Sequence, residues 1–271
     1  MKNKLKGKVA VITGSGRGIG KAIAVEFAKQ GVSVVLNGRN EDRLKETETL
    51  IREITPDVIY FCCDVSDAEN SRKLIQAAID RFGRLDILVN NVGISMRGNM
   101  AELDPLVYRK VFESNVYGTV NPTIPAIPHL RKTKGSIVFI SSLAGIRGLP
   151  GLSAYCSSKM SLRAIAESLR IEEKKHGIHV GLIQVGVTEI EHNKETISAD
   201  GSLKLLETRN KAKVQTTEQV ALAVIKNIKK RKFISTLTAL GKLNNFLQAR
   251  FPLLVEKIIL NNLHKFEEGS R

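Results

Sequence analysis

The sequence predicts an α/β protein built on a doubly wound parallel sheet. Six short runs rich in β-branched residues alternate with longer stretches of helical pattern. The runs are continuously apolar, which is typical of strands that are buried on both faces. A glycine-rich stretch directly after the first run opens the first helical pattern. This alternation implies right-handed βαβ units, and therefore a parallel sheet with helices on both faces.

The expected strands are bounded by Gly, Asn, Asp or Ser. They cover Val9–Thr13, Val32–Asn37, Val58–Cys62, Leu85–Asn90, Ser136–Ser141 and His179–Gln184, and a seventh is expected at Phe233–Leu237. The first helix is expected at Ile19–Gln30, where apolar residues recur at helical spacing. Because no repeat, low-complexity segment or linker interrupts the sequence, we expect residues 1–271 to form a single domain of the Rossmann type.

Length and composition limit the class of protein. A chain of 271 residues with 42% hydrophobic residues can bury a full core. No apolar run reaches the roughly 18 residues of a membrane-spanning helix, and Met1–Gly7 leads into the first strand without a signal-peptide pattern. The cysteines, Cys62, Cys63 and Cys156, lack metal-ligand spacing. We therefore expect a cytoplasmic protein with reduced thiols and no metal site.

The formal net charge of +15 raises the question of nucleic-acid binding. Lys and Arg are spread along the chain without a recognised nucleic-acid motif. Aromatic residues make up only 5% of the chain, and there is no Trp to stack on bases. We therefore expect no nucleic-acid partner. A basic surface of this kind favours anionic partners such as phosphates or lipid headgroups.

The first strand leads into a glycine-rich turn, Thr13–Gly20, and a helix follows at once. Glycines allow the backbone to turn tightly and approach a pyrophosphate, and the helix N-terminus offers unpaired N–H groups. This strand–turn–helix context predicts a dinucleotide site rather than a plain turn. The residues expected to contact the cofactor here are Gly14, Ser15, Arg17, Gly18, Ile19 and Gly20.

The end of the second strand bears on the choice between NAD and NADP. An NAD site usually has Asp or Glu there for the ribose hydroxyls, whereas Arg pairs with a 2′-phosphate. The sequence has Asn37 and Arg39 at this point and no acid before Glu41. Arg17 can converge on the same phosphate through its forked donors. These residues favour NADP(H) as the cofactor, although two exposed arginines on a basic surface would give the same pattern.

A candidate catalytic group follows the fifth strand. Tyr155 and Lys159 are four residues apart, which places them on one face of a helix, and Ser142 lies at the strand end. Reduction of a ketone needs a proton donor beside the carbonyl oxygen. Tyrosine has a pKa of about 10, which a neighbouring ammonium lowers. Lys159 supplies that charge, and Ser142 can polarise the carbonyl by a hydrogen bond.

Together these residues resemble the short-chain dehydrogenase/reductase family over nearly the whole chain. The resemblance rests on motifs that occur in the family order: Thr13–Gly20, Asp64-Val65, Asn90-Asn91-Val92-Gly93, Asn115, Ser142 and Tyr155-Cys156-Ser157-Ser158-Lys159. It implies an oxidoreductase that acts on CH–OH groups. In such an enzyme Tyr155 is the general acid/base, Lys159 binds the nicotinamide ribose and assists Tyr155, and Ser142 orients the substrate carbonyl.

The resemblance also implies roles for residues outside this group. Asn115 corresponds to the asparagine that helps to hold a proton-relay water. Asp64 and Val65 are similar to a pair that contacts the adenine, and Asn91 is similar to a residue that lines the adenosine side.

The chain departs from the family pattern after the sixth strand. The family usually has Pro-Gly there and a Thr a few residues later, whereas this chain has Val185-Gly186 and Ile190. Thr188 stands two positions early and is the residue expected to contact the nicotinamide carboxamide.

Residues 187–215 lack clean periodicity and lie where the family has its substrate lid. Ala199–Ser202 and the residues beyond are similar to the steroid- and lipid-related branch of the family, that of the 11β-hydroxysteroid-dehydrogenase-like proteins. The expected substrate is a hydrophobic ketone or secondary alcohol of steroid or keto-lipid type, and the expected assembly is a homodimer or homotetramer. Two alternatives stay open: a 3-oxoacyl-carrier-protein reductase, for which the basic charge suits an acidic carrier, and a catalytically silent NADP-binding protein.

A C-terminal extension at about residues 240–266 carries large apolar residues at helical spacing, interspersed with basic ones. We expect Lys242–Phe266 to form an amphipathic helix whose apolar face borders the substrate entrance. The face can pack on the domain, meet a second subunit or make a peripheral contact with an anionic bilayer. The sequence leaves these three possibilities open.

Overall fold

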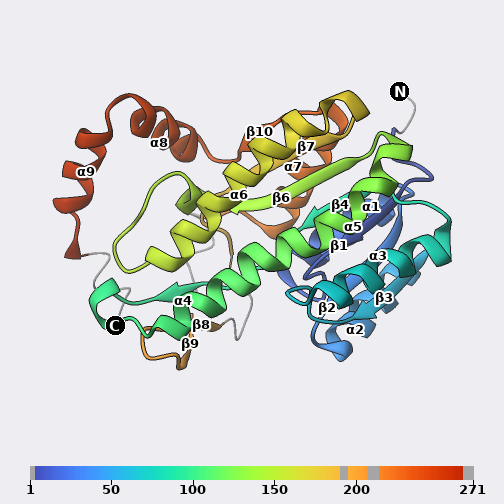
Figure 1. Cartoon of the computed structure of the whole chain (residues 1–271), viewed down its shortest axis with the longest axis horizontal. Coiled ribbons are helices and arrows are strands. Elements are labelled where there is room, and N and C mark those ends of the chain that lie inside the picture. The colour runs from blue at the N-terminus through green and yellow to red at the C-terminus, as the bar shows by residue number, and fades with distance from the viewer. Residues whose placement is uncertain (1–3, 190–194, 207–213, 265–271) are drawn as a thin grey trace.

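A seven-stranded parallel sheet with helices on both faces forms the body of the protein (Figure 1). The structure, a computed structural model, describes residues 4–189, 195–206 and 214–264. The strands are β1 (Val9–Ile12), β2 (Ser33–Gly38), β3 (Val58–Cys62), β4 (Ile87–Asn90), β6 (Ser136–Ser142), β7 (His179–Val185) and β10 (Ile234–Thr236). Their order in the sheet is β10-β7-β6-β4-β1-β2-β3. The doubly wound parallel sheet predicted from the sequence is confirmed, the seventh strand included.

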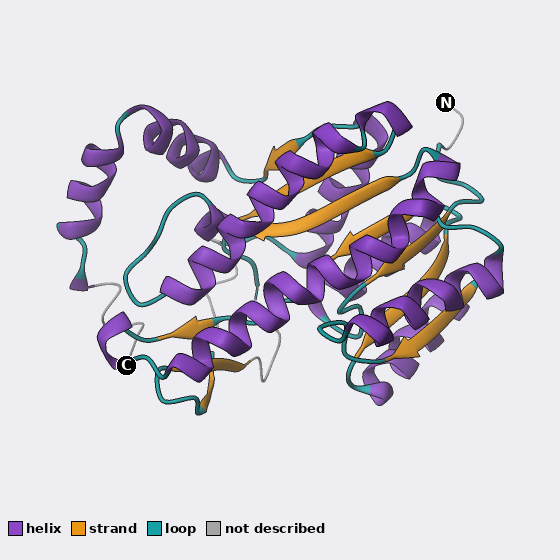
Figure 2. Cartoon of the chain, viewed as in Figure 1, coloured by secondary structure: helices purple, strands orange, loops and turns teal. Residues whose placement is uncertain are grey.

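Two layers of helices cover the sheet (Figure 2). One apolar cluster packs α1 (Gly18–Lys29), α2 (Glu41–Arg52) and α7 (Thr217–Lys230) on one face. A second cluster packs α3 (Ala68–Phe82), α5 (Gly118–Thr133) and α6 (Ser153–Glu172) on the other. Neighbouring residues of β1 divide between them, because Ala10 and Ile12 belong to the first cluster and Val11 to the second. This is why the strands are apolar at every position rather than at every second one.

The strand order changes direction between β1 and β4. Adjacent connections leave the sheet in opposite directions there, and open α/β sheets bind ligands at such a point. The glycine-rich turn follows β1, and the Asn90-Asn91 segment follows β4. Both turns therefore meet at the switch point of the sheet.

A widened helical segment interrupts the connection between β4 and α5. After α4 (Pro105–Phe112), residues Glu113–Tyr117 form a π-helix, labelled η2, before α5 begins. Such single π-turns frequently occur at functional sites. Here the π-turn contains Asn115, whose side chain is buried.

A small second sheet lies beside the main one. It consists of β5 (Met96–Arg97), β8 (Glu195–Ser198) and β9 (Leu203–Leu205), in the order β5-β8-β9. The last two strands belong to the region expected to form a lid, whose sequence shows no clean periodicity. Within that region, residues 190–194 and 207–213 lie outside the described residues.

The C-terminal extension is helical but divided into two helices, α8 (Ala239–Arg250) and α9 (Pro252–Leu260). The expectation of one continuous helix over Lys242–Phe266 is therefore wrong, and its last residues, from 265 on, are outside the described part of the chain. The break has a simple cause: Pro252 has no N–H to donate, and its ring disfavours helical backbone at Phe251, which adopts φ −137° and ψ 60°. Among the described residues, no helix is both long and apolar enough to span a membrane.

Candidate active site

Tyr155 and Lys159 lie one turn apart near the start of α6. The Lys159 Nζ is 5.9 Å from the centroid of the Tyr155 ring. Lys159 is only 5% exposed, and its Nζ donates a hydrogen bond of 3.1 Å to the backbone carbonyl of Ile140 in β6. The helix therefore holds a largely desolvated ammonium beside a half-buried phenol.

Ser142 ends β6, directly before the segment that leads to α6. It caps the short helix Leu143–Gly145, labelled η3, and its Oγ accepts a hydrogen bond of 3.2 Å from the Ala144 N–H. The preceding residue, Ser141, donates from its Oγ to the Lys159 carbonyl at 3.2 Å. These contacts fix the end of β6, which carries Ser142, against the first turns of α6, which carry Tyr155 and Lys159.

Asn115 uses its whole side chain to hold the segment after β4. Its Nδ2 donates to the Ile94 carbonyl at 3.0 Å and to Ser158 Oγ at 2.9 Å, and its Oδ1 accepts from the Ile94 N–H at 2.7 Å. At Gly93, a Cβ would lie 3.0 Å from Lys159 Nζ and 3.1 Å from Asn115 Oδ1. Gly93 thus leaves a narrow gap beside Lys159 that a side chain would fill.

The glycine-rich turn is closed by contacts that exclude side chains. A Cβ at Gly20 would lie 2.2 Å from the Gly14 carbonyl oxygen and 2.6 Å from Asn91 Nδ2. Asn91 Nδ2 donates to the carbonyls of Thr13 and Gly14, both at 3.0 Å. Asn91 therefore acts on the turn itself and fixes the start of α1 beside the end of β4.

The open side of this turn fits an anionic diphosphate. Gly14 and Gly18 have φ of 63° and 55°, values that favour glycine. Arg17, which is exposed, directly precedes α1, and Gly18 and Ile19 form the first turn of that helix, whose N–H groups and positive dipole end suit a phosphate. The residues present thus fit the pyrophosphate of a dinucleotide.

Ser15 and Asn37 are completely buried against each other. The Asn37 N–H donates to Ser15 Oγ at 2.9 Å, and Asn37 Nδ2 donates to the carbonyls of Phe61 and Cys63 at 3.1 and 3.2 Å. Both side chains were expected to contact the cofactor, but the structure uses them to join the turn, β2 and β3. Any contact with a cofactor at these two positions is left to the backbone.

Arg39 and Asp64 meet at the carboxyl ends of β2 and β3. Arg39 Nη1 lies 3.5 Å from Asp64 Oδ2, and the Arg39 side chain is 70% exposed. Asp64 Oδ1 also accepts from the N–H and Oγ of Ser66. Burial raises the pKa of Asp64, but the hydrogen bonds from Ser66 and the charge of Arg39 outweigh it and lower the pKa below its usual value. Val65, the next residue, is buried.

Thr188 follows β7 and turns back on its own chain. It is buried, and its Oγ donates to the Gly186 carbonyl at 3.2 Å. A parallel bridge joins it to Gln215. Thr188 therefore lies at the same edge of the sheet as the other candidate residues, while Ile190 lies outside the described residues.

Arg147 is a residue of this region that the sequence analysis did not single out. It lies between Ser142 and Tyr155, and its guanidinium donates to Gln248 Oε1 at 2.8 Å, the Pro252 carbonyl at 2.8 Å and Glu256 Oε2 at 3.0 Å. These contacts tie the C-terminal helices to the segment that joins the two candidate catalytic residues. No local pattern marks Arg147, because its partners are about a hundred residues away.

Cys63 lies close to the same edge of the sheet but has no nucleophilic character. Burial raises the pKa of its thiol to about 11, despite the hydrogen bond from Asn37. The thiol therefore stays protonated at neutral pH, and thiolate chemistry is excluded at this position.

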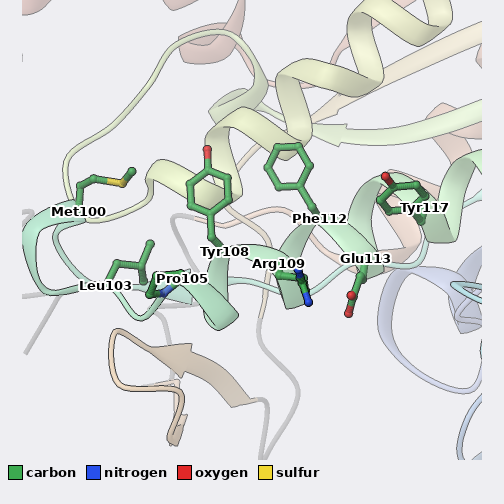
Figure 3. Close-up of a pocket in the computed structure, with 8 residues that line it drawn as sticks. All are labelled: Met100, Leu103, Pro105, Tyr108, Arg109, Phe112, Glu113 and Tyr117. Carbon is green, nitrogen blue, oxygen red and sulfur yellow. The ribbon is translucent and has the colours of Figure 1, made fainter.

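A hollow of about 820 Å³ opens on α4. Figure 3 shows the residues around it, which come from the segment before α4, from α4 and from η2: Met100, Leu103, Pro105, Tyr108, Arg109, Phe112, Glu113 and Tyr117. Tyr108 joins this hollow to α6 by a hydrogen bond of 2.8 Å to Ser157 Oγ. Ser157 and Tyr155 are two residues apart and point to different sides of the helix. We therefore assign the candidate active site to the strand ends and to Tyr155, and not to this hollow.

A glycine-rich turn at the switch point of a parallel sheet, beside a buried lysine and a tyrosine, defines a dinucleotide-binding α/β protein. The profile of the short chain dehydrogenase family matches residues 8–201, and the chain belongs to this family.

Two curated relatives illustrate the range of the similarity. An 11-beta-hydroxysteroid dehydrogenase-like protein, 4A, of Arabidopsis thaliana is 40% identical over 196 residues, which cover 68% of this chain and 64% of the relative. The chain thus spans less than two thirds of the length of that relative. A 3-ketodihydrosphingosine reductase of Mus musculus is 33% identical over 246 residues, covering 88% of this chain and 73% of the relative.

Two solved structures share the fold. A short chain dehydrogenase/reductase of Burkholderia phymatum in complex with NAD has a TM-score of 0.80 at 24% identity, covering 93% of this chain and 96% of its own. An alcohol dehydrogenase of the archaeon Thermococcus sibiricus complexed with 5-hydroxy-NADP has a TM-score of 0.75 at 26% identity, covering 85% and 95%. The two complexes hold different nicotinamide cofactors, so the fold by itself does not choose between them.

Proposed function

We propose that the protein is an NADP(H)-dependent oxidoreductase that interconverts a ketone and a secondary alcohol on a hydrophobic substrate. The observation that carries this proposal is the position of Tyr155 and Lys159 beside the end of β6, the strand that Ser142 ends, at the sheet edge that also holds the glycine-rich turn. A proton donor and a dinucleotide site side by side suit carbonyl reduction.

In this proposal Tyr155 donates the proton to the carbonyl oxygen during reduction and accepts it during oxidation. The ammonium of Lys159, 5.9 Å from the Tyr155 ring centroid, stabilises the phenolate that remains after the proton has left. The Ser142 hydroxyl donates a hydrogen bond to the same carbonyl oxygen and aligns it. Asn115 acts through the backbone at Ile94 and keeps the segment around Gly93 close to Lys159.

The cofactor would be held by Gly14, Gly18, Gly20 and the first turn of α1 at the pyrophosphate. When bound, it supplies the hydride for reduction or accepts it in oxidation. Arg39, together with Arg17, favours NADP(H), because both are exposed basic residues and β2 ends without an acidic residue. At the nicotinamide end, Lys159 contacts the ribose and Thr188 contacts the carboxamide. Asp64, Val65 and Asn91 border the adenosine.

The hydrophobic substrate is supported by the surroundings of Ser142. A Cβ at Gly241 in α8 would lie 2.6 Å from Leu143, the residue after Ser142, so α8 packs directly behind the site. The names of two relatives point to the same class of substrate. One is called a hydroxysteroid dehydrogenase-like protein, and the other a reductase of a keto-lipid, 3-ketodihydrosphingosine. We also propose that residues 187–215 form a substrate lid. The proposed assembly is a homodimer or homotetramer, and the proposed location is the cytoplasm.

The test combines a substrate panel with one variant. The panel contains a steroid ketone, a 3-keto long-chain base, a small ketone and a 3-oxoacyl carrier thioester, each with NADPH and with NADH. Tyr155→Phe should lower turnover roughly a hundredfold or more, since general acid catalysis contributes about that much, while NADPH binding persists. Tyr108→Phe is the matched control, because it removes a hydroxyl that bonds to Ser157, which points to a different side of α6 from Tyr155; its rate should stay near normal.

The outcomes separate the alternatives. Turnover of Tyr155→Phe at the unmodified rate would contradict the mechanism. A preference for the carrier thioester would identify a 3-oxoacyl reductase instead. No turnover with any substrate, with NADPH still bound, would identify a silent NADP-binding protein.

A further inference from the structure

The two C-terminal helices carry an apolar face that nothing in the described structure covers. Exposed large apolar side chains gather on it: Leu240, Leu243 and Phe246 on α8, and Leu253, Leu254 and Ile258 on α9. Leu253 is 78% exposed. Within α8 and α9, both fully described, the only buried residues are Gly241 and Val255. We call the six exposed side chains the C-terminal apolar face.

This face stands at one end of the molecule. Figure 1 shows α8 and α9 beyond the end of the main sheet, at the opposite end of the long axis from α2 and β3, and Figure 2 shows the same two helices apart from the layered body. The two helices therefore lie at an end of the molecule that a large flat partner can reach.

Basic residues accompany the apolar ones. Lys242, Arg250 and Lys257 are exposed. Lys257 follows Leu253 by one turn and precedes Ile258, so it stands within the apolar face of α9. The one acidic residue of the two helices, Glu256, forms an ion pair with Arg147 at 3.0 Å. The exposed charge around the face is therefore positive.

We propose that the C-terminal apolar face docks on an anionic lipid bilayer. The apolar side chains would enter the boundary between headgroups and acyl chains, and Lys242, Arg250 and Lys257 would extend to the headgroups. At 9 residues, α9 is about 14 Å long and lies in the plane of the surface instead of crossing it. This proposal goes beyond the proposed function, because it needs no turnover.

Charge decides between a bilayer and a second copy of the chain. Two copies that met through this face would enclose Arg250 and Lys257 of both copies in one interface, on chains with a net charge of +15 each. Charged residues are depleted from the centres of protein interfaces, and like charges oppose the contact. An anionic bilayer instead offers negative charge to Arg250 and Lys257.

The test measures co-flotation of the full-length protein with phosphatidylcholine vesicles, with and without phosphatidylserine. The unmodified protein should float with the phosphatidylserine vesicles and only weakly with the neutral ones. Leu253→Glu and Lys257→Glu should each lower the partition coefficient roughly tenfold or more, because each adds negative charge at an anionic surface and the first also removes an apolar contact.

Two matched controls show whether the effect belongs to this face. Ile171→Glu places the same charge on a side chain that is 74% exposed near the end of α6, and Lys226→Glu reverses an exposed charge on α7. Both should bind vesicles as the unmodified protein does, and thermal melting should show all four variants folded.

The following results would overturn the proposal: no binding of the unmodified protein to either vesicle, equal binding to both, or an equal loss in the controls. If the unmodified protein instead forms a dimer that Leu253→Glu dissociates, without vesicle binding, the face is a subunit interface. Because vesicle binding is measured without substrate, its failure is distinct from failure of the proposed reaction.

Discussion

Arg39 can pair with either of two anionic groups, the Asp64 carboxylate or the 2′-phosphate of NADP(H). In the structure it pairs with Asp64 across 3.5 Å, at a site where Arg39 is 70% exposed and Asp64 is half-buried. Exposed pairs of this kind contribute little to stability, so the contact orients Arg39 rather than holding it. A 2′-phosphate carries more charge than a single carboxylate and offers oxygens that match the guanidinium fork. In the proposed function, the preference for NADP(H) therefore depends mainly on Arg39.

Arg39→Ala should raise the Kd for NADPH roughly ten- to a hundredfold, since a hydrogen bond to a charged group contributes about 1.5–3 kcal/mol. The Kd for NADH, which has no 2′-phosphate, should change much less. Fluorescence titration of both cofactors measures the two values. Arg52→Ala, which removes an exposed arginine from the far end of α2, is the control and should leave both unchanged. Equal affinity of the unmodified protein for NADH and NADPH would remove the basis for the choice of NADP.

The segment between β6 and α6 links three parts of the protein. It begins after Ser142, ends before Tyr155, and carries Arg147 between them. The Arg147 side chain is only 18% exposed and joins α8 to α9, through Gln248 in the first helix and Pro252 and Glu256 in the second. The C-terminal helices are therefore attached to the part of the chain that spaces the candidate catalytic residues.

Arg147→Ala should raise KM for bulky ketones roughly tenfold and lower kcat less, because it releases the wall of the site without removing a reacting group. Reduction of a small ketone should change little. Glu256→Gln should have a smaller effect in the same direction, because Arg147 keeps its contacts with Gln248 and the Pro252 carbonyl. Steady-state kinetics with paired substrates measure the difference. An equal loss for small and bulky ketones would show that Arg147 merely supports the fold.

Most of the main strands could be predicted from the sequence because they are buried on both faces, whereas the edge strands β3 and β10 are only partly buried. β6 and β7 are apolar runs whose burial leaves a continuous signal, and the predicted boundaries differ from the observed ones by one residue. The small sheet gives no such signal. β8 and β9 have 4 and 3 residues, and β8 pairs with β5, which lies about a hundred residues earlier. Only the Asp200-Gly201 turn between them marks the hairpin locally, through Gly201 at φ 86°.

Helix interruptions differ in how visible they are. The break between α8 and α9 has a sequence signal in Pro252, which apolar spacing alone overlooks. No sequence signal marks the π-turn around Asn115. One residue inserted in a helix changes the hydrogen-bond pattern of the backbone, but it does not change the composition of the segment.

The candidate site was predictable where spacing alone determines geometry. Tyr155 and Lys159 share a helix face whatever surrounds them. Ser15 was assigned to the cofactor because it lies in the glycine-rich turn, and Asn37 because it ends the second strand, yet both side chains are completely buried. In a strand buried on both sides, polarity does not show which way a side chain points, since either direction leads into the protein.

The two edges of the main sheet, at the carboxyl and the amino ends of its strands, carry different groups. The carboxyl ends of the strands carry the glycine-rich turn and the candidate catalytic residues, while ion pairs between a buried carboxylate and a half-exposed arginine lie at the amino ends. Asp86, directly before β4, accepts hydrogen bonds from Arg84 at 2.8 and 2.7 Å and is completely buried as a side chain. Glu173, before β7, accepts from Arg131 at 2.8 and 2.6 Å. Stability can therefore be altered at one edge without touching the other.

Asp86 makes the stability of the protein depend on pH. Burial raises the pKa of Asp86, but the hydrogen bonds from Arg84 and the Val9 N–H and the charge of Lys8 outweigh it and lower the pKa below its usual value. A carboxyl with a lowered pKa in the folded state stabilises the fold fully above the unfolded value of about 3.9. This contribution is lost as the pH falls through the folded value.

Asp86→Asn should lower the free energy of unfolding by roughly 1–3 kcal/mol at neutral pH, because it keeps the shape of the side chain and removes the charge that Arg84 and Lys8 pair with. The deficit should shrink at about pH 3, where the unmodified protein is losing the same charge. Urea unfolding at the two pH values measures it. Glu167→Gln, which breaks an exposed pair with Arg163, should cost less than about 0.5 kcal/mol.

NADPH affinity should be unchanged in Asp86→Asn, because Asp86 lies at the opposite edge of the sheet from the glycine-rich turn. A deficit of the same size at both pH values, or a loss of NADPH binding, would contradict this separation of the two edges.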